Sequence, residues 1–72
     1  MKTKEQIQQE NEYTDVFTIE EFAEQVNDGL INSFDGYGYL HDGVRETRIN
    51  VWDETLTYED VIKYPYVCWY NK

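Results

Sequence analysis

FTIEEFAEQV, residues 17–26, is the stretch of sequence that decides the fold. Thr18 can cap a helix while the side chain of Glu21, three positions later, bonds back to the cap, which is the reciprocal capping box. Phe17 and Phe22 occupy the two positions of a hydrophobic staple across that helix start. Apolar side chains then repeat at the spacing of one helical face, at Ile19, Phe22, Ala23 and Val26. Because Asn27-Asp28-Gly29 supplies a C-terminal stop, the pattern predicts a helix over residues 18–28.

A hairpin is expected next, because residues 36–44 read GYGYLHDGV and Asp42-Gly43 is a preferred two-residue turn. With that turn, His41 pairs with Val44 and Tyr39 pairs with Glu46. The first face of the hairpin should meet the helix and carries Leu40, Thr47, Ile49 and Val51. The second face should meet solvent or a partner and carries Tyr37, Tyr39, His41, Val44, Glu46 and Arg48. A slip of one residue would exchange the two faces.

The remaining elements complete a small α+β fold. Thr57, with Asp60 at the third helical position, predicts a helix of one or two turns that Pro65 ends. Residues 66–70, YVCWY, are rich in strand-forming side chains and predict a last strand. We therefore expect the order α-β-β-α-β, with an antiparallel sheet of about three strands and one main helix packed on one face.

The chain is long enough for one domain, which we place over residues 15–72. It has 72 residues, with two Trp, seven Tyr and three Phe to build a core. Residues 1–14 carry Ile7 as their single aliphatic side chain after Met1, so they offer no apolar face to dock. We expect this segment to be a flexible tail or a marginal helix.

The charge of the chain restricts its partners. Fifteen acids against six bases give a formal net charge of −9, and the stretch from Glu5 to Val44 holds ten acids without any Lys or Arg. Such a chain repels nucleic acid and anionic lipid, because phosphate binding depends on Lys and Arg. We expect no direct contact with nucleic acid or membrane, and any charged partner should be a basic protein. Solubility alone would also explain the acidity.

The sequence shows no pattern of residues that is typical of a catalytic site or a metal site. His41 and Cys68 are the only histidine and the only cysteine, and Cys68 lies in an alternating strand where it reads as a small buried hydrophobe. The carboxylate pairs Asp53-Glu54 and Glu59-Asp60 lack the spacing of a calcium loop. We expect no catalytic residue, no metal and no cofactor.

Tyrosines beside acids form the one constellation with the chemistry of a binding site. Tyrosine anchors interfaces at low entropic cost, and carboxylates around it select Lys- and Arg-rich surfaces. We expect the partner-binding residues to be Glu20, Glu24, Asp28, Asp35, Tyr37, Tyr39 and Asp42. The same tyrosines could instead serve the core.

The segments FTIEEFAEQVNDG, DGYGYLHDG and YVCWYNK resemble small acidic phage-encoded proteins. The resemblance implies a non-catalytic inhibitor of a basic host nuclease, of the anti-restriction or anti-CRISPR kind, in some cases acting as a DNA mimic. It also implies the cytoplasm of a bacterial host, which a lone cysteine and the absence of a long apolar run favour independently. The alternative is a general interaction or regulatory adaptor, antitoxin-like, whose acidity serves solubility. Acids gathered on one continuous face would favour the inhibitor, and scattered acids would favour the adaptor.

Overall fold

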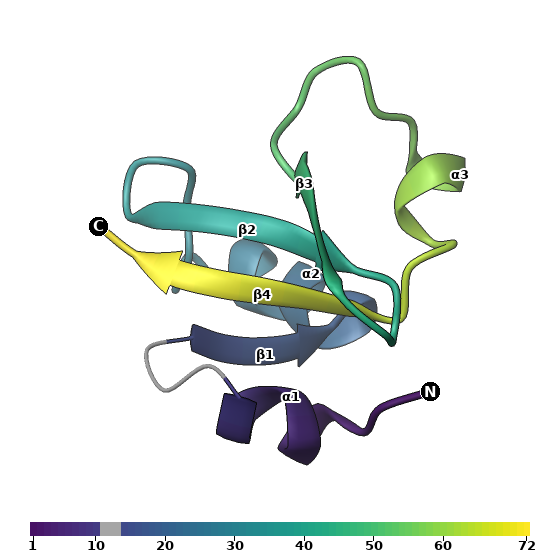
Figure 1. The fold of residues 1–72 in the computed structure, drawn as a ribbon. Coiled ribbons are helices and arrows are strands. Elements are labelled where there is room, and N and C mark those ends of the chain that lie inside the picture. The colour runs from purple at the N-terminus through teal and green to yellow at the C-terminus, as the bar shows by residue number, and fades with distance from the viewer. Residues whose placement is uncertain (11–13) are drawn as a thin grey trace.

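The computed structural model describes residues 1–10 and 14–72, which form an antiparallel sheet with helices on both of its sides (Figure 1). The strands lie in the order β1-β4-β2-β3. In chain order the elements are α1 (Lys4–Glu10), β1 (Thr14–Thr18), α2 (Ile19–Asn27), β2 (Gly36–His41), β3 (Glu46–Asn50), α3 (Tyr58–Val61) and β4 (Tyr66–Asn71). The predicted α+β class is confirmed, but the described residues contain four strands rather than about three.

The additional strand is β1, which comes directly before the main helix. It pairs antiparallel with β4, with Val16 opposite Cys68. Thr18 is both the last residue of this strand and the cap of α2, so the chain passes from strand to helix without a loop. Phe17 and Thr18 therefore belong both to the strand and to the helix start. Their sequence pattern indicated the helix start, and so the strand was not predicted.

Helix α2 begins as predicted. The Oγ1 of Thr18 accepts the N–H of Glu21 at 3.1 Å, and a carboxylate oxygen of Glu21 accepts the N–H of Thr18 at 2.9 Å. The rings of Phe17 and Phe22 lie 6.2 Å apart, as a hydrophobic staple requires. Of the apolar stripe predicted for this helix, Ala23 is exposed, whereas Phe22 is buried and Ile19 and Val26 pack against the core.

The sheet has a separate apolar core on each side. The core beneath α2 contains the buried residues Phe22, Ile31, Leu40, Val67 and Trp69. Ile49 and Val51 pack against it, so the predicted meeting of this hairpin face with the helix is confirmed. The core on the α1 side contains Ile7, Val16 and Cys68. Neighbouring residues of β4 serve opposite cores because side chains alternate along a strand.

Helix α1 docks on the sheet through one residue. Ile7 is fully buried, so the expectation that this segment has no face to dock is wrong. The side-chain oxygen of Gln8 accepts the backbone N–H of Val16 at 2.9 Å, which ties α1 to the outer strand β1 (Figure 1). Lys4 adds an ion pair with Glu21 of α2 at 3.1 Å. The expected tail of residues 1–14 includes residues 11–13, which lie outside the described part.

The hairpin between β2 and β3 does not have the predicted register. His41 pairs with Glu46 and Tyr39 with Asn50, with a bulge between them. Asp42 explains the longer loop, because its Oδ1 accepts the backbone N–H groups of Val44 and Arg45, each at 2.8 Å. The predicted pairs His41–Val44 and Tyr39–Glu46 are therefore wrong.

The predicted exposure of His41 is also wrong, because it is buried beneath the N-terminal segment. Gly43 adopts φ +94° against the side chain of Met1, and the N–H of Lys2 donates to the carbonyl of Gly43 at 2.7 Å. The hydroxyl of Tyr66 donates to the carbonyl of Lys2 at 3.3 Å. These contacts close the α1 side of the hairpin over His41, whose exposed fraction is 2%.

Candidate functional site

The structure separates the predicted binding residues into groups. Glu20 and Glu24 are exposed on α2, and Asp28 caps the C-terminal end of that helix. Asp35 precedes β2 and Asp42 follows it, so these two acids lie at opposite ends of one strand. Glu20 and Glu24, four residues apart on α2, therefore lie on one side of that helix, whereas Asp35 and Asp42 cannot both lie close to it at one end of the sheet.

Tyr37 and Tyr39 lie on the other side of the sheet from α2. They alternate with Leu40 of the α2 core, and their rings stack on one another with centroids 6.4 Å apart. Tyr70 makes an edge contact with Tyr39 and donates its hydroxyl to Glu46 at 2.7 Å. The tyrosines thus form an aromatic row on the sheet, separate from the acids of the helix.

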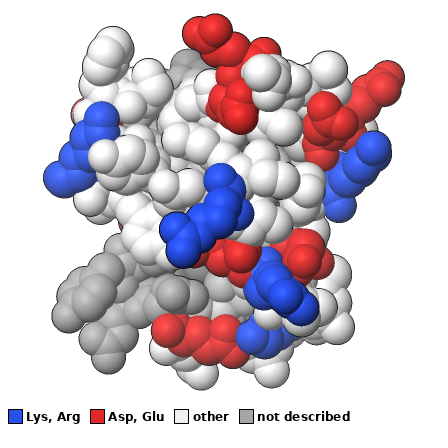
Figure 2. Space-filling view, turned by 45° about the horizontal axis from the view of Figure 1, so that its top comes forward, with Lys and Arg blue, Asp and Glu red and all other residues white. Residues whose placement is uncertain are grey.

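Charged groups are mixed around this aromatic row. The Nζ of Lys72 lies 5.2 Å from the centroid of the Tyr37 ring, a distance suited to a cation–π contact. Figure 2 shows Lys and Arg side chains lying between acidic ones on the face that it presents. The aromatic row therefore lacks the purely acidic surroundings that the sequence led us to expect.

Helix α2 presents acids without bases. It contains Glu20, Glu21 and Glu24 and neither Lys nor Arg. Hydrogen bonding from the Thr18 backbone and the side chain of Lys4 lowers the pKa of Glu21, so this carboxylate is engaged within the fold. The ion pairs of the described residues do not involve Glu20 or Glu24. These two carboxylates are therefore free to meet a cation from outside.

Asp42 has a structural role in its loop. Hydrogen bonds from the backbone N–H groups of Arg45 and Val44 lower the pKa of its carboxyl group. The carboxylate is therefore already satisfied by the hairpin that it shapes.

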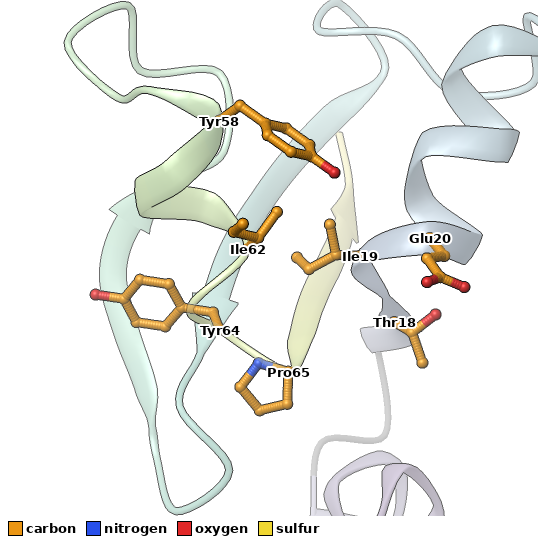
Figure 3. A pocket seen from close by; sticks show the side chains of 7 residues that line it. All are labelled: Thr18, Ile19, Glu20, Tyr58, Ile62, Tyr64 and Pro65. Atoms are coloured by element: carbon orange, nitrogen blue, oxygen red, sulfur yellow. The ribbon is translucent and has the colours of Figure 1, made fainter.

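A groove between α2 and α3, which the sequence did not indicate, lies directly beside Glu20. One cavity, of about 510 Å³, is lined by Thr18, Ile19, Glu20, Tyr58, Ile62, Tyr64 and Pro65. Figure 3 shows Ile19 and Ile62 pointing toward one another across it. A second cavity, of about 250 Å³, shares Ile19 and Tyr58 with the first and extends along α2 past Ala23. We call the two cavities together the α2–α3 groove.

Large apolar side chains remain exposed in this groove. Tyr58 is 76% exposed and Ile62 is 50% exposed. They lie four residues apart, at the start and the end of α3, where helical neighbours share a face. Val61, in the same turn, packs against the core. The sequence spacing of Tyr58 and Ile62 therefore indicates an apolar pair on another side of α3, but it does not indicate the groove.

Trp52, one of the residues that line the second cavity, also has an unsatisfied polar atom. The Nε1 of Trp52 is buried and has no hydrogen-bond acceptor among the described residues. In contrast, Nε1 of Trp69 donates to Asn71 at 2.9 Å. A buried donor without a partner costs about 1–3 kcal/mol, so an acceptor brought to Trp52 would be favourable.

The border of the groove on the α2 side is acidic, because Glu20 lines the larger cavity and Glu24 follows Ala23, which lines the second. Besides the acids of α2, the segment of residues 51–65 carries four acids and one base, Lys63. Hydrogen bonds from Thr57 lower the pKa of Asp60, and hydrogen bonds from Thr55 lower that of Asp53, which favours their charged forms. The groove therefore combines a largely apolar lining with a negative rim on the α2 side, at Glu20 and Glu24.

His41 and Cys68 are both buried in the sheet. Burial and the neighbouring Glu46 raise the pKa of the Cys68 thiol to about 12, so it stays protonated near neutrality. Burial lowers the pKa of His41, whose Nδ1 accepts the N–H of Gly43 at 2.9 Å. In the sheet, His41 lies opposite Tyr66 and Cys68 lies opposite Tyr39. Both side chains are used to fill the α1 side of the sheet.

Within the described ranges, no group of three or more His, Cys, Asp or Glu side chains is placed to hold a metal ion. No helix in these ranges is long and apolar enough to cross a membrane. The chain matches no protein-family model, no curated protein and no solved structure. The groove and the acids of α2 are thus the features of the molecule that indicate binding.

Proposed function

We propose that this protein is a non-catalytic binding protein whose partner is a basic segment of another protein. The observation that carries the proposal is the pair of exposed carboxylates, Glu20 and Glu24, without internal ion-pair partners beside an open groove. Carboxylates in such a position attract Lys and Arg and raise association rates at low salt.

The phage-type inhibitor expected from the sequence is one member of this class, since its target would be a basic nuclease. A DNA mimic would need acids spaced along one surface, as phosphates are. The acids of α2 follow such a line, whereas Asp35 and Asp42 lie at opposite ends of β2. This distribution supports binding of a basic segment more directly than it supports imitation of a duplex.

Charge reversal tests the proposal with a peptide of Lys-Pro-Ser repeats, which offers charge without apolar side chains. The double variant Glu20→Lys/Glu24→Lys should weaken peptide binding at least about fivefold, a coupling of roughly 1 kcal/mol. The matched control Glu5→Lys/Asp15→Lys changes the net charge equally at exposed positions away from the groove. Titrations followed by nuclear magnetic resonance (NMR) would give both affinities.

Two results would contradict the proposal. Equal weakening by the two double variants would show that only net charge matters and that α2 is not the site. Affinity unchanged between about 50 and 200 mM salt would exclude an electrostatic contact, because screening lengths shorten over that range.

A further inference from the structure

We infer that the α2–α3 groove binds apolar side chains of that basic segment, which lies along the groove in an extended conformation with its Lys and Arg residues toward the acidic rim. This inference rests on the proposed function and adds the place and the chemistry of the contact. Its basis is the union of three features at one site: exposed apolar side chains, an unsatisfied donor and a negative border.

The apolar contribution comes from side chains that the fold leaves partly uncovered. Ile19, Tyr58 and Ile62 surround the larger cavity (Figure 3). The exposed methyl group of Ala23 leaves room along α2 for the second cavity. An aliphatic side chain that enters either cavity would gain about 0.8 kcal/mol for each buried methylene group.

The extended conformation follows from the hydrogen bonding of Trp52. Its indole N–H needs an acceptor, and the interior carbonyl groups of a helix are already bonded within that helix. An extended or polyproline segment has no internal hydrogen bonds, so its carbonyl groups are free to accept. Because this nitrogen is buried, neighbouring side chains must shift to admit the carbonyl group, and Tyr58, which lines the same cavity, is largely exposed and so free to do so.

The charge of the partner follows from the rim. Glu20 lines the larger cavity, and Glu24 lies one helical turn further along α2. Glu59 of α3 is exposed and follows Tyr58 in the chain. An apolar segment flanked by acids would be repelled here, whereas one flanked by Lys or Arg would be attracted to the α2 side of the groove.

Two peptides that differ only at their apolar positions test the inference. The first has Lys-Pro-Leu repeats, and the second has the Lys-Pro-Ser repeats used above. The Leu peptide should bind the full chain at least about fivefold more tightly at the same salt concentration, since each Leu buries several methylene groups. The double variant Tyr58→Ser/Ile62→Ser should remove this difference, so that the two peptides bind it with equal affinity.

The chain offers a matched control for the double variant and another for the NMR resonance of Trp52. Phe34→Ser/Val44→Ser removes two exposed apolar side chains that do not line the groove, and it should leave both affinities unchanged. In NMR spectra the Leu peptide should shift the indole N–H resonance of Trp52. The resonance of Trp69, whose N–H is already bonded, should stay in place.

The outcomes separate the inference from the proposed function. Equal binding of the two peptides, or an unshifted Trp52 resonance, would overturn the groove as the apolar site. The proposed function would then still stand if the Ser peptide bound and the reversal at Glu20 and Glu24 weakened it. Failure of both peptides to bind would overturn the proposed function and the inference together.

Discussion

The two sides of the sheet are covered in different ways. Helix α2 covers one side with a core of five buried residues and many half-buried neighbours. Helix α1 covers the other side with one buried side chain, Ile7, against Val16 and Cys68. The contrast shows that a short helix can dock without an amphipathic pattern. One apolar residue packs against the sheet, and polar side chains form hydrogen bonds and ion pairs with neighbouring elements. Changes on the two sides should therefore differ in size.

The largest effect is expected on the α2 side from Phe22→Ala. Phe22 is 5% exposed and its ring contacts those of Phe17, Trp52 and Trp69. Removing it should lower the free energy of unfolding by about 3–5 kcal/mol, because a cavity is left in the middle of the core. Urea unfolding followed by far-ultraviolet circular dichroism would measure this loss. A loss below about 1 kcal/mol would show that the core beneath α2 is not the main source of stability.

A smaller effect is expected on the α1 side from Ile7→Ala. The loss should be about 2 kcal/mol, at the low end for such a substitution, because α1 can detach instead of enclosing a cavity. The matched control is Gln9→Ala, an exposed position of the same helix, which should change stability by less than about 0.5 kcal/mol. If the two variants were equally stable, residues 4–10 would behave as the tail that the sequence suggested.

The smallest effect is a pH dependence confined to the α1 side. Burial lowers the pKa of His41 below its unfolded value of 6.5, and the positive charge of Lys2 lowers it further. The negative charges of Asp42 and Glu46 act in the opposite direction. The unfolded state therefore binds the proton more readily, so stability is complete above pH 6.5 and falls as the pH drops below it. One group contributes at most about 1.4 kcal/mol per pH unit.

Comparison with His41→Gln would isolate this effect. Between pH 7 and about 5 the native chain should lose stability while the variant stays nearly constant, because ordinary carboxyl groups titrate lower. Amide hydrogen exchange should show α1 losing protection before α2. A variant with the same slope as the native chain would assign the pH dependence to groups other than His41.

Local signals in the sequence predicted the elements well and their pairing poorly. Both capping boxes, at Thr18 and at Thr57, form as the residue spacing indicated, because capping involves neighbours in the chain. The predicted register of the hairpin is wrong because the carboxylate of Asp42 accepts hydrogen bonds that lengthen the turn. The docking of Ile7 was not predicted, because Ile7 packs in a cluster with Cys68, which is far along the chain.

The candidate site was predicted only in part for the same reason. The acids at Glu20 and Glu24 could be placed on an exposed helical surface from their spacing. The groove beside them could not be predicted, because it depends on the distance at which α3 lies from α2 in the fold. The tyrosines Tyr37 and Tyr39 were placed on the correct side of the strand, but not relative to the acids.

The hydrogen bond between Gln8 and Val16 has a consequence for how copies of this chain behave together. An edge strand with free N–H groups invites another chain to add a strand of its own, which leads to domain swapping or fibrils. Gln8 occupies one such N–H group on β1, and α1 lies beside that edge. The N-terminal helix therefore contributes to colloidal behaviour as well as to stability, and shortening the chain at this end would expose a surface for self-association.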